Sequence, residues 1–505
     1  MGEGGAGTPG NGDSGWLDRA ASWFDERLGL SHQFLRPAPR YSINPFYWLG
    51  ALAVVAFVIQ AVTGMMMLLY YIPTTSEAYL STQFIFQNVS YGAFLETVHL
   101  YTAYAMIMLA FMHMMRGFFV SAHKKPRELM WLVGMGMGFV TLGFGFTGYL
   151  LPWTVISKSG TDVGLGMIDA LPQPLSSFLS FLVVGAGGGA AELLRFFDLH
   201  VLVLPAALLT LLVVKMYLLE THGVSEPVTG AVPVPKEKAR LIPIFPDVSL
   251  YLFELAALFG SAMLLISALF PVELPPQYTP QLASQFVAQP DWYFLWIYQI
   301  LKISAFEKAG ITVAMSAVTL IFASLILLPF IDRGRSRRIA SRMKFFTLGA
   351  IFVSEIVALS IWGLLTPGRM IPNEQAVLVL GGTALIVGAA SVVAHRLVFR
   401  GLTRLMGAPP RPKAPAAPLH SAHVWTAGSF ILLLSVGTLA FGSLINGATA
   451  LALGGVTTSG IASLTPPLAV FLAALVGTAY LLYRLDLGSG MIRRRVKAFE
   501  RGWKE

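Results

Sequence analysis

The stretch ETVHLYTAYAMIMLAFMHMMR, residues 96–116, decides the fold, because a single apolar run carries a histidine near each end. The interval from His99 to His113 falls about 40° short of four full helical turns. Both imidazoles therefore leave one helix face, about 21 Å apart along the axis. This distance fits within a hydrocarbon core about 30 Å thick. An ionisable side chain inside a membrane helix indicates a functional site.

A second apolar helix repeats the pattern, with His200 at its start and Lys215 about four turns later. A lone histidine on an apolar face more often hydrogen-bonds to a neighbouring helix than binds a metal, but the repetition favours a set of ligands. Two helices that each carry two nitrogen donors about 20 Å apart form two sandwich sites. This is the geometry of two b-type haems with axial ligands from both sides.

The composition predicts an all-α integral membrane protein. Of the 505 residues, 55% are hydrophobic and 12% are charged, and the mean hydropathy is +0.67, whereas soluble domains have about 25% charged residues. The chain has no cysteine, which excludes disulfides, a cysteine-ligated iron–sulfur cluster and covalently attached haem. The net charge of +9 does not indicate nucleic-acid binding, because Lys and Arg cluster in loops between apolar runs.

Ten apolar segments are long enough to span a membrane. They lie near residues 47–70, 93–119, 130–151, 199–219, 249–270, 310–331, 344–365, 375–397, 423–445 and 465–484. Basic residues follow the second, fourth, sixth and eighth segments and fill the C-terminal tail. The positive-inside rule therefore predicts that both termini are cytoplasmic. His99 and His200 then lie near the outer surface, and His113 and Lys215 near the inner one.

The N-terminal region has two features. Residues 1–15 are Gly-rich without an apolar core, so we expect no cleaved signal peptide. Residues 16–30 are amphipathic, which is typical of a helix lying on the membrane surface and equally of an ordinary packed surface helix.

Two long outer loops, 152–198 and 271–309, carry Pro, Trp and Tyr next to a membrane edge. Such residues form either an aromatic belt or a pocket open to lipid. Composition alone favours the belt, but the carboxylate of Asp291, between Pro290 and Trp292, is unfavourable there.

Glycine spacing supports the haem interpretation independently. Gly50 and Gly64 in the first segment are separated by the same interval as His99 and His113, and so are Gly134 and Gly148 in the third. A flat macrocycle between helices needs a close approach of the backbone, which glycine allows. General small-residue packing of membrane helices explains one such pair, but explains two pairs at one spacing less well.

With these features the chain resembles the cytochrome b family of quinol-oxidising bc and bf complexes, over residues 16 to about 340. The likeness is closest to the split bf-type form, here fused into one chain with extra C-terminal helices. The matching stretches are QAVTG (60–64), KKPREL (124–129), GYLLPW (148–153), LHVLVLP (199–205), PDWY (290–293) and LPFIDR (328–333).

The resemblance implies roles by position. His99 and His200 match the ligands of the outer haem iron, His113 matches one ligand of the inner haem iron, and Arg116 matches a haem propionate partner. The four residues Pro290 to Tyr293 match the outer quinol-site motif, in which Asp291 is the expected proton acceptor. Gly160 would line the same pocket.

The family would imply quinol oxidation at the outer side, with one electron passed to a Rieske iron–sulfur protein. The other electron would cross through two haem b groups to an inner quinone site, coupled to proton translocation in a prokaryotic plasma membrane. The Rieske protein must be a separate chain, because this one has no cysteine; a c-type cytochrome and dimeric assembly are also expected. Two alternatives remain open: a di-haem anchor that passes electrons between quinone and a peripheral dehydrogenase without bifurcation, and a haem-free transporter or scaffold.

The expected domains follow the same likeness. They are an N-terminal segment (1–46), a four-helix di-haem domain (47–230), a quinol-site domain (231–343), further membrane helices (344–410), and two extra helices with a basic tail (411–505). The extra helices are either a docking surface for an accessory subunit or plain lipid-facing packing.

Three positions depart from the family pattern. Trp48 replaces the cysteine that tethers an extra haem in the bf branch, and Glu96 stands where the family commonly has Arg. Lys215 stands where the fourth haem ligand is normally His, and His222 lies too far along the helix to replace it. A charged lysine at a membrane helix centre costs about 2.5–3.5 kcal/mol. Three arrangements relieve this cost: ligation of the inner iron as a neutral amine, extension to the interface beside a five-coordinate haem, or absence of the inner haem. We favour ligation.

Overall fold

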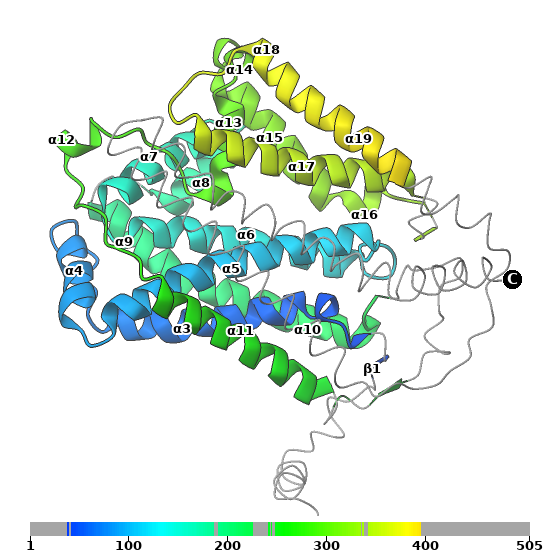
Figure 1. Ribbon diagram of the computed structural model, residues 1–505, viewed down its shortest axis with the longest axis horizontal. Coiled ribbons are helices and arrows are strands. Elements are labelled where there is room, and N and C mark those ends of the chain that lie inside the picture. The colour runs from blue at the N-terminus through cyan, green and yellow to red at the C-terminus, as the bar shows by residue number, and fades with distance from the viewer. Residues whose placement is uncertain are drawn as a thin grey trace, which may run out of the picture.

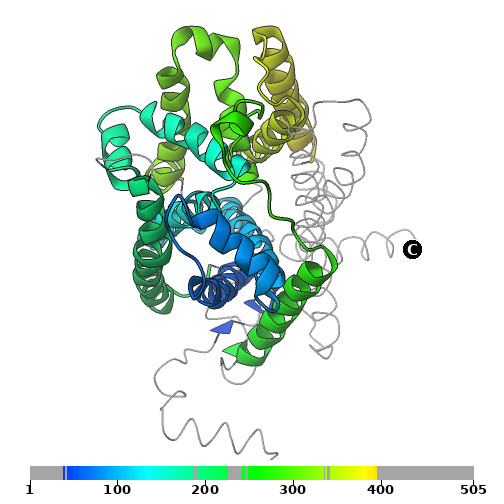
Figure 2. The same ribbon diagram turned by 90° about the vertical axis from the view of Figure 1, so that its left-hand side faces the viewer.

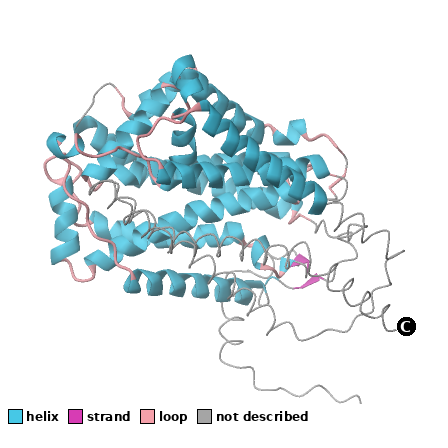
Figure 3. Cartoon of the chain, turned by 45° about the horizontal axis from the view of Figure 1, so that its top comes forward, coloured by secondary structure: helices cyan, strands magenta, loops and turns pink. Residues whose placement is uncertain are grey.

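The computed structural model describes residues 38–39, 42–185, 190–225, 241–242, 244, 248–334, 336–337 and 342–394. This part of the chain is mostly helical, with one short antiparallel strand pair, β1 (Ala38–Pro39) and β2 (Leu241–Ile242) (Figures 1 and 3). The predicted amphipathic helix at 16–30 and the predicted spans at 423–445 and 465–484 lie outside the described residues.

Seven helices within the described ranges are long and apolar enough to cross a membrane. They are α3 (Leu49–Leu68), α5 (Gly92–Phe119), α6 (Glu128–Leu150), the run α9 (Ala190–Asp198), η3 (Leu199–Val203) and α10 (Leu204–His222), α11 (Ser249–Leu269), α17 (Met343–Leu365), and the run α18 (Asn373–Ala376), η8 (Val377–Gly381) and α19 (Gly382–Ala394). They match seven of the eight spans predicted for this part of the chain, and they confirm an all-α multi-pass membrane protein.

The shorter helices connect or flank these spans. They are η2 (Pro45–Tyr47), α4 (Ala78–Asn88), α7 (Val155–Asp169), α8 (Leu175–Val183), α12 (Pro280–Ala283), η6 (Trp292–Phe294), α13 (Leu295–Leu301), α14 (Ser304–Ala309), α15 (Ile311–Ile326) and α16 (Leu328–Ile331). In Figure 1, α4, α7, α9 and α12 gather at the left end of the spanning helices, which we call the loop end. The opposite end, where α5 ends and Lys124 and Arg127 follow it, is the basic end.

The main core lies where α3, α5 and α11 meet, and α10 lies along α6 beside them (Figure 2). Leu49, Leu109 and Phe259 are fully buried there. The outward faces of the spans are apolar as well, since Val213 and Tyr217 of α10 are each 70% exposed. Helices that are apolar on all sides suit a lipid environment.

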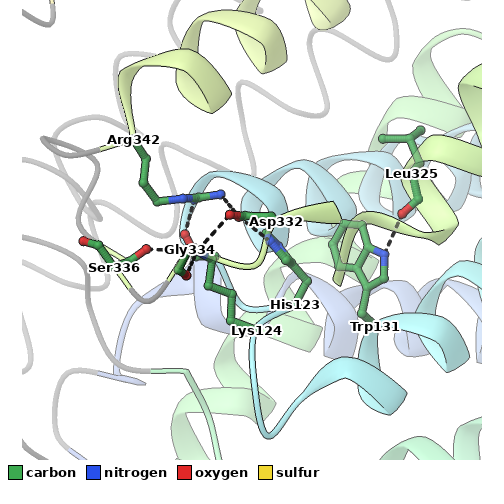
Figure 4. A network of polar contacts seen from close by, with 9 residues as sticks. His123, Lys124, Trp131, Leu325, Asp332, Gly334, Ser336 and Arg342 are labelled. Carbon is green, nitrogen blue, oxygen red and sulfur yellow. Dashed lines mark hydrogen bonds and ion pairs between the residues drawn. The ribbon is translucent and has the colours of Figure 1, made fainter. Parts of the chain in front are cut away.

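The span predicted at 310–331 is interrupted, and a proline explains why. α15 ends at Ile326 and the separate turn α16 begins at Leu328. Pro329 has no N–H to donate to the carbonyl of Leu325, and its ring clashes with that group. The Leu325 carbonyl instead accepts a hydrogen bond from Trp131 Nε1 of α6, at 2.8 Å (Figure 4). The break therefore also joins α15 to α6.

A buried ionic network joins the loop after α5 to the segment that follows α16 (Figure 4). The carboxylate of Asp332 contacts His123 Nε2 and Lys124 Nζ, each at 2.9 Å, and accepts from Arg342, which also donates to Ser121. Burial acts to raise the pKa of Asp332, but hydrogen bonds from Lys124 and His123 and the charge of Arg342 hold it below its usual range. The carboxylate therefore stays ionised and holds the two halves of the chain together at the basic end.

Asp332→Asn should lower the thermal denaturation midpoint of the purified complex, because it leaves buried cationic groups without their anion. Removing one partner of a buried pair costs about 3–5 kcal/mol. The matched control is Asp162→Asn, whose side chain is 47% exposed and pairs with Lys158, since exposed pairs contribute only about 0–1 kcal/mol. Equal midpoints for the two variants would contradict the role of Asp332.

Candidate functional site

The two histidines nearest the loop end face each other across a gap between helices. His99 on α5 and His200 in η3 have ring centroids 6.3 Å apart, with the rings tilted by 60°. A Cβ atom added at Gly64 would lie 3.4 Å from His99 Cε1, and one added at Gly148 would lie 2.6 Å from His200 Cε1. The predicted pair is therefore brought together, and each ring lies against the backbone of a neighbouring helix at a glycine.

Hydrogen bonds to two threonines orient this pair. Thr63 Oγ1 lies 2.8 Å from His99 Nδ1, and Thr147 Oγ1 lies 3.1 Å from His200 Nδ1. Each hydroxyl donates its own proton to a carbonyl one turn earlier in its helix, so it accepts from the imidazole. Nδ1 then carries the proton in both rings and Nε2 keeps a free lone pair, which is how metal-binding histidines are usually held.

The second nitrogen pair lies nearer the basic end. A Cβ atom at Gly50 would lie 3.2 Å from His113 Cε1, and one at Gly134 would lie 2.9 Å from Lys215 Nζ. Lys215 is within electrostatic range of His113, and its Nζ donates to the carbonyl of Met130 at 2.6 Å. All four predicted glycines thus face the four predicted nitrogen side chains, one to one.

These pairs suit a metal that a planar macrocycle already holds. Among the described residues, no three His, Asp or Glu side chains converge on one point, and two nitrogen side chains lie opposite glycines at each of the two levels. The guanidinium of Arg116, one turn beyond His113, lies 4.0 Å over the ring of Tyr47. It keeps a positive charge at the level of the second pair.

A buried carboxyl, that of Asp291, stands in the segment before α13 and contacts α5, the helix that carries His99 and His113. Asp291 caps η6 and is 7% exposed. Its Oδ1 accepts hydrogen bonds from the backbone N–H of Trp292 at 2.7 Å and from the Tyr104 hydroxyl at 3.5 Å. The indole of Trp292 meets the rings of Tyr104 and Tyr293 edge-on, with centroids 6.0 and 5.5 Å away.

This environment changes the acidity of the carboxyl. Burial raises the pKa of Asp291 to about 6, and the hydrogen bonds from Trp292, Tyr104 and Tyr293 act in the opposite direction by stabilising the ionised form. A carboxyl with this pKa is ionised at neutral pH and can take up a proton there.

Glycines also shape this second region. A Cβ atom at Gly160 of α7 would lie 2.6 Å from the carbonyl of Gln289 and 2.9 Å from the ring of Tyr149. Gly160 therefore allows α7 to pack against the segment that leads into Pro290, and Pro290 is itself buried.

Sequence reasoning missed three side chains of this site. Thr63 and Thr147 each directly precede a predicted glycine, so the repeated Thr-Gly pair could have identified them. Neither Gly50 nor Gly134 has a threonine before it. Tyr104 lies on the helix of His99, and no local pattern indicates that its hydroxyl reaches Asp291.

Two protein-family models match the chain. One, described as cytochrome b (N-terminal)/b6/petB, matches residues 104–280, and the other, cytochrome b (C-terminal)/b6/petD, matches residues 280–381.

Similar proteins come from several organisms. A cytochrome bc complex cytochrome b subunit of Chlorobaculum thiosulfatiphilum is 33% identical over 347 residues, covering 66% of this chain and 78% of the relative. Cytochrome b of Sulfolobus acidocaldarius is 31% identical, covering 72% and 69%. Cytochrome b6 of Heliobacterium mobile is 37% identical over 212 residues, covering 41% and 99%. A solved structure titled "Hyperthermophilic respiratory Complex III" matches with a TM-score of 0.59 at 25% identity, covering 75% of this chain and 98% of that one.

Proposed function

The chain belongs to the cytochrome b family, as the cytochrome b subunit of a bc-type, Complex III-like oxidoreductase, and from this premise we propose that it oxidises quinol beside Asp291. The observation that supports this most is the contact of Asp291 with Tyr104, because Tyr104 stands on the same helix as His99 and His113. The proposed proton acceptor therefore contacts the helix that carries two of the proposed haem ligands.

The residues around Asp291 have distinct parts in the proposed reaction. A quinol that becomes a quinone releases two electrons and two protons. The ionised carboxylate of Asp291 accepts one of those protons, and the other passes to water on the outer side. The N–H of Trp292 and the hydroxyl of Tyr104 hold the carboxylate in place. Tyr293 and the buried Pro290 complete the set of side chains that would surround the quinol.

His99, His200 and His113 are the proposed iron ligands of two haem b groups, a cofactor typical of the family. Bound haem would supply the one-electron carriers by which the second electron reaches a quinone at the basic end. Thr63 and Thr147 keep the two Nε2 lone pairs available, and the glycines opposite the ligands leave space for the flat ring.

The remaining assignments follow from charge and composition. We place the basic end, with Lys124, Arg127 and Arg342, on the cytoplasmic side of a prokaryotic plasma membrane. Quinol oxidation then occurs on the outer side and contributes to proton translocation. The first electron goes to a Rieske iron–sulfur protein on a separate chain, with a c-type cytochrome beyond it and a dimeric complex around them.

One experiment separates this function from a non-bifurcating di-haem anchor. Quinol is added to the purified complex with the inner quinone site inhibited, an oxidant for the Rieske centre follows, and haem b absorbance is recorded. If each quinol is split, removal of its first electron forces the second onto haem b, so the oxidant causes transient haem reduction. An oxidant that only oxidises haem b would contradict bifurcation.

Tyr104→Phe should move the pH dependence of quinol oxidation upward by about 0.4–1 unit. The variant removes a donor to the ionised carboxylate, which raises the pKa of Asp291; a hydrogen bond contributes about 0.5–1.5 kcal/mol, and one pKa unit corresponds to about 1.36 kcal/mol.

The matched control is Tyr101→Phe on the same helix, whose hydroxyl donates to the Phe270 carbonyl at 2.9 Å. The pH at half-maximal turnover is measured for both variants. A Tyr104→Phe profile that coincides with the control would show that Tyr104 does not position Asp291.

A further inference from the structure

We propose that Lys215, as a neutral amine, is the axial ligand opposite His113 in the haem site nearer the basic end. This rests on the proposed function, because it presupposes that the chain holds two haems. It adds a His/Lys pair to the site, whereas the family pattern places histidine at this position.

The register of the helix brings Lys215 to the ligand position. The interval from His200 to Lys215 is one residue longer than that from His99 to His113, which is a difference of about 100° on a regular helix. His200 lies in η3, a π-helical turn in which the N–H of Leu204 bonds to the carbonyl of Leu199. Such a turn inserts one extra residue. The two spacings therefore become equivalent. Lys215 lies toward the basic end from His200, on the same helix face, as His113 does from His99.

Pro205 gives a local reason for this turn. It has no N–H to donate to the carbonyl one turn earlier, and its ring displaces that carbonyl. The sequence that produces the π turn is thus the one that corrects the spacing of the two donors.

The glycine opposite Lys215 supports the same conclusion. The Nζ of Lys215 lies 2.9 Å from the Cβ position of Gly134, and Gly148, further along the same helix, faces His200 in the same way. The lysine nitrogen occupies the place on α6 that an imidazole occupies one level away. A side chain larger than hydrogen at residue 134 would require the lysine nitrogen to shift from this position.

The hydrogen bond of Lys215 is compatible with a coordinating amine. The Nζ donates to the carbonyl of Met130 at 2.6 Å, and a neutral amine that donates one proton still keeps its lone pair, which metal binding requires. No carboxylate of the described residues forms an ion pair with Lys215. A charged ammonium would therefore have no anion among the described residues, and the Met130 carbonyl orients the amine as the threonine hydroxyls orient the imidazoles.

The partner of Lys215 is also available for a metal. The Nδ1 of His113 is buried without a hydrogen-bond partner among the described residues. Buried polar atoms are rarely left unpaired, so this ring nitrogen, unlike the Nδ1 atoms of His99 and His200, is one that coordination would satisfy.

The test is the ferric spectrum of the purified complex, by electron paramagnetic resonance and near-infrared magnetic circular dichroism, which report the axial ligands. We expect two low-spin haems, one bis-histidine and one histidine–amine. In Lys215→Leu the histidine–amine signal should be absent, either because that haem becomes high-spin or because it is no longer bound. In Lys215→His it should become bis-histidine. The matched control is Lys302→Leu, since Lys302 Nζ also donates to a backbone carbonyl, that of Thr366, at 2.5 Å.

The outcomes separate this proposal from the proposed function. Two bis-histidine signals, a high-spin inner haem in the unmodified complex, or an unchanged spectrum in Lys215→Leu would each overturn ligation while leaving a di-haem protein. A single bis-histidine haem would overturn ligation and leave the outer site. No haem at all would overturn the proposed function itself. If Lys215→Leu does not assemble, the unmodified complex and Lys215→His still decide.

Discussion

Asp291→Asn should slow quinol oxidation by about 10²–10⁴-fold, the usual contribution of a general acid–base group. The amide is close to the carboxylate in shape, so it can still accept from the N–H of Trp292 at 2.7 Å and keep η6 capped. It cannot take a proton from quinol. Steady-state turnover with quinol is measured together with the haem b spectrum, which should be unchanged because Asp291 is no haem ligand.

The pKa of Asp291 predicts the direction in which turnover changes with pH. With the pKa of Asp291 raised to about 6, the carboxyl is protonated and inactive as an acceptor below that pH, so turnover should rise as pH increases through this value. The rise should be absent in Asp291→Asn. The matched control is Asp169→Asn, whose exposed side chain accepts from Ser180. Unchanged turnover in Asp291→Asn would rule out Asp291 as the acceptor.

His200→Ala should remove one of the two haem b groups and abolish electron transfer from quinol to the inner side. The imidazole is held by Thr147 at 3.1 Å and lies against Gly148, so alanine leaves a space that no other described nitrogen donor enters. A redox titration followed in the visible spectrum should lose the component of the outer haem and keep that of the inner haem.

A second histidine on the same run of helix controls for this prediction. His222 is the last residue of α10, at the opposite end of this span from His200, and its carbonyl accepts from Arg127. Its backbone makes that contact, so His222→Ala should keep both components. A His200→Ala protein with both components intact would show that His200 is not a ligand.

Features that depend on spacing along one helix could be predicted from the sequence. The face shared by His99 and His113, and the glycines at the same interval, follow from helical periodicity alone. Packing then matched each glycine with one nitrogen side chain. The interruption at Pro329 could have been predicted in the same way, because a proline inside an apolar run ends or kinks a helix, but the span expected at 310–331 was continuous.

Features that depend on contacts between distant segments could not be predicted in this way. Tyr104 and Asp291 are 187 residues apart, and His123 and Asp332 are 209 apart. No local pattern specifies such partners, since they depend on how the helices pack. For the same reason, composition alone favoured an aromatic belt in loops 152–198 and 271–309, because only packing reveals that Asp291 is buried.

The count of haem b per polypeptide in the purified complex tests the central claim most directly. The iron-bound haem is extracted, quantified as its pyridine adduct, and divided by the amount of this chain. Four nitrogen side chains, two near the loop end and two nearer the basic end, each opposite a glycine, predict two haem b groups per chain. A value of one would contradict the pairing of His113 with Lys215 as a haem site, and a value near zero would contradict the account as a whole.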